Sequence, residues 1–502
     1  MKLIIKKIMK DKILFWCDRK FMHFGIAKSL QEKYDCELFA IIQLTDRTTD
    51  IFREQQVVKF NQTWIFNDYV SKENHEYDLN FLTSFEEKYG IDLWKIAYTD
   101  PTLSYNRYHK FTRDEILSIF TQECKLFEEV LDKVKPHFLA IRSYDNQDTR
   151  ILVELCKARG IKILMASGTR LDERWVISDE DDYLQDYTKN NSDSSITYDV
   201  LQKYLNTSSL RQKKIMTYRK NTTWKDLQSA LFLFLFHHND KYLFLNHGRS
   251  RSKMITKNIS SQLKKKYRAS FINKNCTYEI DADEKFVYFP MQYEPERSLF
   301  IPAPFYTNQL EVITNVARSL PVEYKLYVKE YPGMKVQNWR NTSYYKQIMN
   351  LPNVRLVHTS VNAKEIIKKC SLVVSISGSA CLEATYHNKP SIVFADVSFS
   401  SLPSVHRIKS YEDLPQVIRV SLQKKVDLSE LRKFMHFMEQ NSFEFDFLDP
   451  LIEVDAFYNK GVLSKNALSI ENIESCLEKN KPTFDMLALE YIKKINELKN
   501  IA

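Results

Sequence analysis

Residues 373–384, VVSISGSACLEA, join an apolar run to a helix-like segment through a small, hydroxyl-rich loop. The loop consists of Ser377, Gly378 and Ser379, and Glu383 follows within about one turn of the expected helix. Backbone N–H groups and hydroxyls at a helix N-terminus favour an anion, because the helix dipole is positive there. The loop therefore predicts a phosphate site, with Glu383 as an acceptor for ribose hydroxyls. A tight turn with nothing bound is the alternative.

A second polar cluster, YVKEYPG, ends another strand-like run. In open α/β sheets, ligands bind at the carboxyl ends of the strands. Lys329 can neutralise a diphosphate or sugar-phosphate leaving group there. We treat Lys329 and Glu330 as candidate catalytic residues. Lys329, Tyr331 and Pro332 are candidate binding residues for the substrate that carries this phosphate. A surface lysine at a strand end is the simpler interpretation of Lys329.

The segment YFPMQYEPERS, residues 288–298, follows a third strand-like run. Gln292, Glu294 and Glu296 offer hydrogen-bond acceptors near the expected ligand edge, and the prolines stiffen the loop. Gln292 and Glu294 are candidate donor-binding residues. Solvated loop side chains are the alternative.

In the first 180 residues, IRSYDNQDTR and ASGTRLDERW each follow a strand-like run. A carboxylate at this edge can deprotonate an acceptor hydroxyl if it lies within hydrogen-bond reach. Asp145 and Asp148 are the candidate bases, although Asp145 can equally be a helix N-cap. The sequence does not choose among the charged residues of the two segments, which are Arg142, Asp145, Asp148, Arg170, Asp172 and Arg174.

These segments need a scaffold in which strands alternate with helices. Strand-like and helix-like runs alternate through residues 12–42 and 137–168, with a long helix predicted over 113–134 and an irregular aromatic stretch before it. The alternation resumes at 285 and continues to 396. Such alternation indicates parallel sheets covered by helices. A chain of 502 residues exceeds one ordinary core,.

We therefore expect an α/β protein with two doubly wound, Rossmann-like units. The predicted domains are an N-terminal Rossmann-like domain (1–182), a helical and basic insertion (183–280), a C-terminal Rossmann-like domain (281–425) and a helical tail (426–502). The last helix of the tail is expected to pack back across both domains.

The composition indicates a cellular compartment and excludes several classes of protein. The eight cysteines form no CxxC pair, which favours buried thiols in the cytoplasm,. The apolar pieces of the N-terminus are broken by lysines, so we expect neither a signal peptide nor a spanning helix,. The chain has no GxGxxG, GxxxxGK[ST], GxSxG or HExxH motif and no spacing typical of a metal site,. The net charge of +9 is mild, and we expect no nucleic-acid partner,.

The segment 249–268 has eight basic residues and no acid. It is either a solvated helical face or a contact with an anionic membrane surface or a charged lipid-linked acceptor.

In their order and spacing, YFPMQYEPERS, NQLEVITNVARSLP, LYVKEYP, LPNVRLVHTS and SISGSACLEATYHNKPSIVFADV resemble the capsule polysaccharide biosynthesis family, which is similar to bacterial Kdo transferases and sialyltransferases. The resemblance covers residues 285–415, extends to 137–180, and is not visible in the helical middle or the tail. It implies a GT-B architecture, with two Rossmann-like domains facing a cleft and the donor bound by the C-terminal one.

Residue by residue, the family's KEHP segment corresponds to Lys329, Glu330, Tyr331 and Pro332, with Tyr331 in place of the usual histidine. That histidine is thought to hold the donor phosphate. A tyrosine can donate a hydrogen bond but cannot become cationic near neutral pH. An altered donor, a compensating basic residue or reduced activity would each accommodate this difference.

The resemblance implies a metal-independent glycosyltransferase of surface polysaccharide assembly at the cytoplasmic face of the membrane. Its substrates would be a nucleotide sugar, with a CMP-linked sugar as one candidate, and a glycan or lipid-linked acceptor, without a tightly bound cofactor. A polyol-phosphate transferase of the teichoic-acid type and a non-catalytic glycan-binding scaffold are the alternatives.

Overall fold

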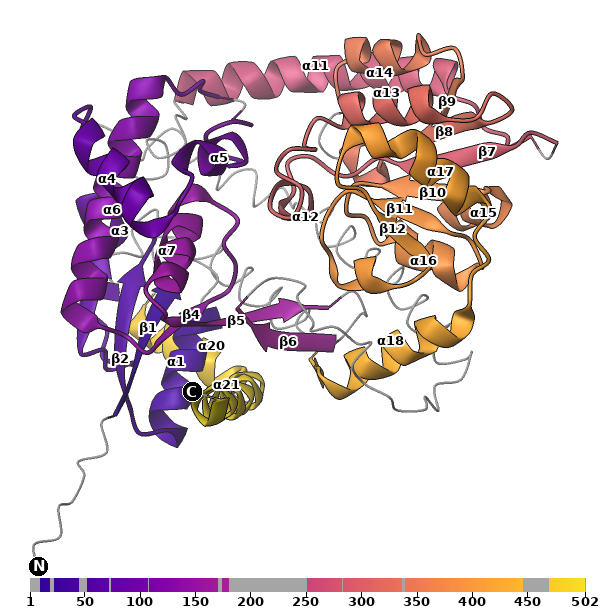
Figure 1. Cartoon of the computed structure of the whole chain (residues 1–502). Helices are drawn as coiled ribbons and strands as arrows, with labels where there is room; N and C mark the ends of the chain where they lie inside the picture. Colours follow the sequence, from indigo (N-terminus) through magenta and orange to yellow (C-terminus); the bar gives the residue numbers. More distant parts are fainter. Residues whose placement is uncertain are drawn as a thin grey trace, which may run out of the picture.

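The computed structural model of the chain contains two separate β-sheets (Figure 1). It describes residues 10–18, 22–44, 52–71, 74–106, 108–169, 174–179, 251–281, 283–335, 339–445 and 469–501. Several sequence predictions lie outside these residues, namely the lysine-broken start of the chain, the helical character of 183–250, and Arg170 and Asp172.

The first sheet has seven strands in the order β13-β6-β5-β4-β1-β2-β3. The pairs among β1 to β5 are parallel, and β6 and β13 join antiparallel. The strands are β1 (Asp11–Cys17), β2 (Cys36–Ile42), β3 (Gln62–Ile65), β4 (Phe138–Ile141), β5 (Lys162–Gly168), β6 (Arg174–Ser178) and β13 (Phe443–Glu444).

The helices of this domain follow local signals in the sequence. The 22-residue α6 begins at Thr112, which forms a capping box with Glu115, and ends at Lys135 in a left-handed conformation just before Pro136,. The described part of the aromatic stretch predicted to be irregular instead contains regular elements, among them β3 and the helices α3, α4 and α5. The helices are α1 (Met22–Lys33), α3 (Phe66–Tyr69), α4 (Leu79–Tyr89), α5 (Leu93–Tyr98), α6 (Arg113–Val134) and α7 (Gln147–Ala158).

The second sheet has six parallel strands in the order β12-β11-β10-β7-β8-β9. In sequence order this is the 3-2-1-4-5-6 arrangement of a doubly wound fold, which reverses direction between β7 and β10. Its strands are β7 (Phe286–Pro290), β8 (Lys325–Lys329), β9 (Val354–Val357), β10 (Leu372–Ser375), β11 (Ser391–Val393) and β12 (Val405–Arg407).

Helices cover both faces of this sheet (Figure 1). They are α12 (Arg297–Phe300), α13 (Gln309–Ser319), α14 (Thr342–Met349), α15 (Ala363–Lys369), α16 (Ala380–Tyr386), α17 (Leu414–Leu422) and α18 (Leu428–Gln440), with 3-10 turns η2 (Pro332–Lys335), η3 (Ser398–Ser401) and η4 (Tyr411–Asp413).

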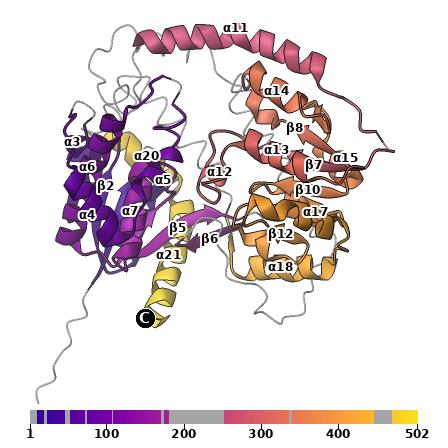
Figure 2. The same ribbon diagram turned by 45° about the horizontal axis from the view of Figure 1, so that its top comes forward.

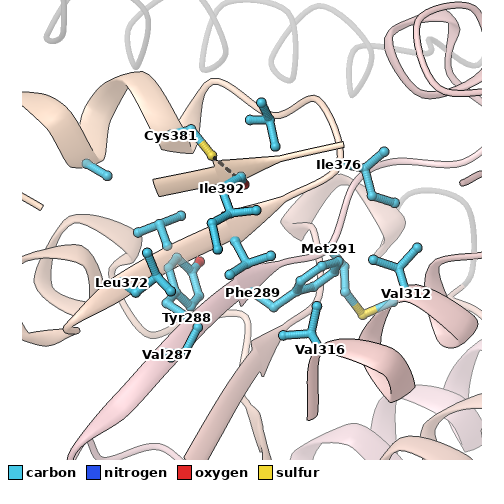
Figure 3. Packing of buried hydrophobic residues seen from close by; sticks show 14 of the residues in the cluster. Val287, Tyr288, Phe289, Met291, Val312, Val316, Leu372, Ile376, Cys381 and Ile392 are labelled. Atoms are coloured by element: carbon cyan, nitrogen blue, oxygen red, sulfur yellow. Dashed lines mark hydrogen bonds between the residues drawn. The ribbon is translucent and has the colours of Figure 1, made fainter. Parts of the chain in front are cut away.

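The core of the second domain lies directly beneath the loops of interest. Phe289 from β7 packs with Val312 and Val316 from α13, and all three side chains are fully buried (Figure 3). Cys381 at the start of α16 donates to the carbonyl of Ile392 at 3.5 Å, which fixes this helix against β11. The inner strands β7, β8, β10 and β11 are buried on both faces, as expected for a parallel sheet covered by helices,.

The tail divides between the two domains. Helix α18 packs on the C-terminal core, whereas β13 and the helices α20 (Ile470–Lys479) and α21 (Lys481–Ile501) join the N-terminal domain. The predicted return of the last helix is thus seen on the N-terminal side, where α21 packs against α1. A Cβ added at Gly25 of α1 would lie 2.5 Å from the ring of Phe484, so this helix crossing requires glycine,.

The two domains meet at α12. The ring of Tyr105 stacks on that of Phe300 with centroids 4.3 Å apart, while Ile301 packs against the N-terminal core. A second link runs from Arg174 of β6 to the end of α18, where its Nε donates to the Ser442 hydroxyl at 2.9 Å. Two Rossmann-like domains joined in this way, with tail helices returning to the first, form a GT-B-like architecture, as predicted.

Helix α11 (Arg251–Asn275) precedes the second sheet. It forms a single rod along the outside of the two domains (Figures 1 and 2). Among the helices that the structure describes, none has the length and hydropathy of a membrane-spanning segment. All eight cysteines are thiols, and six of them are buried.

Candidate functional site

Three loops meet at one edge of the C-terminal sheet, because β7, β8 and β10 are adjacent and parallel. They are the loops predicted to bind a ligand, and they begin at Met291, Glu330 and Ile376. The backbone N–H of Met291 donates to the carbonyl of Lys329 at 2.9 Å. The edge lies at the reversal of strand order between β7 and β10, where doubly wound folds bind their ligands.

Gln292 joins the loops on the two sides of this reversal. Its side-chain amide donates to the hydroxyl of Ser377 at 2.7 Å, and its Oε1 accepts from the Ser377 backbone N–H at 3.1 Å. Both residues are buried, with 8% and 0% exposure. Gln292 is therefore placed at the predicted site, but its side chain holds the protein's own loop.

In the loop at 377–379, two of the backbone N–H groups expected to bind a phosphate already donate to protein groups. The Ser377 N–H is taken by Gln292, and the Gly378 N–H donates to the Ser375 hydroxyl at 3.1 Å. A Cβ at Gly378 would lie 2.6 Å from that hydroxyl, so the close approach needs glycine,. Of the loop groups predicted to hold an anion, these two amides already have partners. Ser379 is exposed at the start of α16 and makes no capping bond with its side chain.

Arg340 lies at the centre of the network behind this edge. It is 8% exposed, its Nε lies 2.9 Å from Glu330 Oε2, and its Nη2 donates to the Gln292 carbonyl at 2.7 Å. Its Nη1 forms a second ion pair with Glu294. Burial opposes the charge of Arg340, but attraction from the two carboxylates raises its pKa. The sequence analysis missed this residue, although it lies ten positions after Glu330 and is basic.

Two predicted site residues, Glu330 and Glu294, belong to the Arg340 network. Glu330 is 2% exposed and also accepts from the Tyr345 hydroxyl at 2.8 Å. Glu294 additionally accepts from Gln309, and burial raises the pKa of Glu294 despite the neighbouring Arg340. Both carboxylates are held by protein groups, so their direct effect is to fix the ends of β7 and β8.

Lys329, the last residue of β8, differs from these neighbours. It is 5% exposed, and within the described chain its ammonium forms no hydrogen bond or ion pair. Burial lowers the pKa of Lys329. A buried cation without a counter-charge is costly to the fold, so this position is suited to an incoming anion.

Glu383 and the KEYP segment complete the edge. Glu383 is partly exposed, and its carboxylate has no hydrogen bond or ion pair to any described residue. Burial raises the pKa of Glu383, opposed by Lys364. Tyr331 packs edge-on against Tyr293 with centroids 5.8 Å apart, and Pro332 opens η2.

The two candidate bases of the N-terminal domain are in different environments. Asp145 follows β4, accepts from the Ser143 hydroxyl at 3.2 Å, and lies 3.4 Å from Nε of Arg297 in the other domain. Asp148 is 3% exposed and accepts from Gln43 and from the N–H of Thr149. Only Asp145 is thus brought to the junction of the two domains.

The sequence analysis named Arg142 but missed its partner, Asp18. Asp18 follows β1, and its carboxylate lies 3.4 Å from Nε of Arg142, which follows β4. The N-terminal sheet reverses its strand order between β1 and β4. The available signal was the position of Asp18 at the carboxyl end of the first strand.

Further acids lie buried beneath this edge. Asp100 accepts from the N–H of Gln147 at 2.7 Å and so caps α7, and burial raises the pKa of Asp100 to about 7. Glu123 is 1% exposed, and its Oε2 has no hydrogen-bond partner. Burial, followed by repulsion from Asp148, raises the pKa of Glu123 well above its usual range. The described residues contain no group of three His, Cys, Asp or Glu side chains that could hold a metal ion.

Residues 197–402 match the family model described as capsule polysaccharide biosynthesis protein. This region is therefore similar to the capsule polysaccharide biosynthesis family, and we call it the capsule-family region. The capsule-family region contains the ends of β7, β8 and β10 and thus the whole Arg340 network. It also reaches back to residue 197, so the expectation of no resemblance in the helical middle was wrong.

Several solved structures are similar to the chain. KpsC of Thermosulfurimonas dismutans, a β-Kdo 2,7 transferase, is 13% identical over 62% of this chain and 79% of that chain, with a TM-score of 0.30. UDP-GlcNAc 2-epimerase of Neisseria meningitidis, bound to UDP-GlcNAc, is 11% identical over 86% and 99%, with a TM-score of 0.25. TM-scores this low support no argument about activity. No curated protein matches the chain in a sequence comparison.

Proposed function

We propose that the chain is a glycosyltransferase of surface, capsule-type polysaccharide biosynthesis. It transfers a sugar from a nucleotide-sugar donor, with a CMP-linked sugar as one candidate, to a glycan or lipid-linked acceptor. The observation that carries the proposal is Lys329, a buried ammonium that has no counter-charge among the described residues and ends β8, the strand next to the reversal of strand order in the capsule-family region. A donor phosphate supplies the missing negative charge.

In the proposed reaction, the acceptor oxygen forms a bond to the anomeric carbon as the bond from that carbon to the donor phosphate oxygen breaks. Lys329 stabilises the negative charge of the departing phosphate, as protein cations do in metal-independent transfer. Glu383 accepts from a donor hydroxyl. Glu330 acts through Arg340 as a positioning residue, because both of its oxygens are engaged.

Asp145 is the proposed base that takes the acceptor proton. It lies beside the second domain, within 3.4 Å of Arg297, whereas Asp148 is buried and already hydrogen-bonded. A base must reach the proton it removes, which favours Asp145. We place the reaction in the cytoplasm, at the inner face of the membrane.

The first test is thermal unfolding of the full chain with CMP, UDP, GDP and their sugars, in the wild type and two variants. Lys329→Met removes the proposed phosphate partner, and Lys325→Met removes an exposed lysine from the other end of β8 as a matched control. A charge-assisted hydrogen bond contributes about 1.5–3 kcal/mol. One nucleotide should stabilise the wild type and Lys325→Met, and should bind Lys329→Met about 10- to 100-fold more weakly.

Failure of every nucleotide to stabilise the wild type would contradict the proposal and favour a non-catalytic scaffold. If Lys329→Met binds the nucleotide as tightly as the wild type does, Lys329 is not the phosphate partner, and the proposal loses its main support. Mass spectrometry of the product provides the second test. A new glycosidic bond supports glycosyl transfer, and a phosphodiester identifies a polyol-phosphate transferase instead.

A further inference from the structure

Helix α11 is fixed to the C-terminal domain by its last turns. Ile272 is 1% exposed within the C-terminal core. Arg268 donates to the carbonyl of Trp339 at 3.1 Å and to Asn341. Figures 1 and 2 show the rest of α11 extending from this attachment along the outside of the molecule. The orientation of the helix is therefore set at one end.

The projecting part carries three large apolar side chains that face solvent. Ile259, Leu263 and Tyr267 are 58%, 72% and 61% exposed. Their spacing of four residues places them on one face of the helix. Isolated exposed apolar residues are ordinary, but a contiguous group marks an interaction surface. We call these three residues the α11 stripe.

The α11 stripe points away from the protein. Successive helical residues are turned by about 100°, so Ile272, nine positions after Leu263, lies on the opposite side of the helix. Because Ile272 is buried in the C-terminal core, Leu263 faces outward. The contacts that anchor the helix thus leave the stripe accessible.

Lysines flank the α11 stripe on both sides. By the same angular spacing, Lys266 lies along one border, and Lys253, Lys257 and Lys264 lie along the other; all four are exposed. Helix α11 contains no Asp or Glu. An apolar stripe between rows of lysines, with no acid to repel phosphates, matches the charge of an anionic lipid surface.

We propose that α11 docks on an anionic membrane, with its lysines on lipid phosphates and the α11 stripe at the boundary of headgroups and acyl chains. This inference rests on the proposed function, which places the acceptor at the inner face of the membrane. Helix α11 provides the contact between the protein and that membrane. The helix lies in the membrane plane and does not cross it.

Cosedimentation of the full chain with lipid vesicles tests this inference. The wild type should bind phosphatidylglycerol-containing vesicles and not pure phosphatidylcholine vesicles, and salt should weaken the binding. Leu263→Glu should lower the partition coefficient at least tenfold. Leu489→Glu, at a 56% exposed leucine of α21, is the matched control and should bind like the wild type. Lys264→Glu should lower it more than about fivefold, since each lysine near the surface contributes about 1 kcal/mol.

Absence of binding to anionic vesicles would overturn the inference, as would equal effects of Leu263→Glu and Leu489→Glu. A change of oligomeric state in Leu263→Glu, measured by light scattering, would identify a second copy of the chain as the partner and overturn it too. Nucleotide binding and vesicle binding by the wild type separate the two proposals. If nucleotides bind and vesicles do not, only the docking of α11 fails; if vesicles bind and nucleotides do not, only the transferase fails.

Discussion

Replacing Arg340 by methionine tests whether the donor edge depends on one buried cation. The substitution keeps most of the side chain's length but leaves Glu330, which is 2% exposed, and Glu294 without their ion-pair partner. Removing one member of a buried ion pair costs about 3–5 kcal/mol, because the remaining charge is neither paired nor hydrated. We expect a loss of this size in the C-terminal domain.

The matched control is Arg355→Met. Arg355 also pairs with a glutamate, Glu284 at 3.0 Å, but its side chain is 42% exposed. Glu284 is 12% exposed but keeps its second ion pair, with Lys325, so no charge is left without a partner and this variant should unfold nearly as the wild type does. The double variant Arg340→Met/Glu330→Gln should recover part of the loss, because the orphaned charge is removed.

Urea denaturation, combined with hydrogen exchange of peptides covering the end of β7, measures both variants. Exchange resolves the local effect even if the two domains unfold separately. Arg340→Met should also lose nucleotide-induced protection, which Arg355→Met should retain. A cost below about 1 kcal/mol for Arg340→Met, or no recovery in the double variant, would refute the reasoning that buried charges hold this edge together.

Three other predictions concern Gln292, Glu123 and Gly25. Gln292→Leu should destabilise the C-terminal domain by about 1–3 kcal/mol in urea denaturation, because it leaves the buried N–H of Ser377 without an acceptor,; an unchanged midpoint would contradict this. The raised pKa of Glu123 means that the folded protein keeps a proton that the unfolded chain releases, so stability should fall as pH rises above the ordinary carboxyl range,. Glu123→Gln should flatten this fall in denaturation series from pH 4 to 8, and parallel curves would exclude the effect. Gly25→Val should separate α1 from Phe484 and cost about 1–3 kcal/mol, read as a lower melting temperature,; a wild-type value would show that the ring can move aside.

The strands and long helices were predictable where local signals agreed. The helix predicted over 113–134 is α6 at its observed bounds, because a clear helical period ends just before Pro136. Short elements were not predicted, because they carry few local signals. Strand β3 has only four residues, and the adjoining α3 has no side-chain cap. In such segments tertiary contacts decide the conformation.

The meeting of the three candidate loops at one sheet edge was predicted, but the bonding within them was not. Because parallel strands end at one edge, the positions of Gln292, Lys329 and Ser377 followed from the order of strands alone. Their partners did not follow, since Arg340 reaches Gln292 across 48 residues of sequence. The local sequence pattern did not show that Glu330 pairs with Arg340. It also did not show that Lys329 has no counter-charge among the described residues. Long-range pairing of charges depends on the packed structure.

The position of α21 has a consequence for biosynthesis. The core of the N-terminal domain includes Leu487 and Tyr491, both fully buried, and the hydroxyl of Tyr491 lies 3.2 Å from His23. A ribosome that has made the first sheet's parallel strands must still synthesise more than the whole second sheet before these residues emerge. The C-terminal domain can therefore complete its core first, and the domain encoded first closes last. A chain released before α21 is made would leave α1 with an uncovered apolar face, so the first domain cannot complete its core until α21 is synthesised.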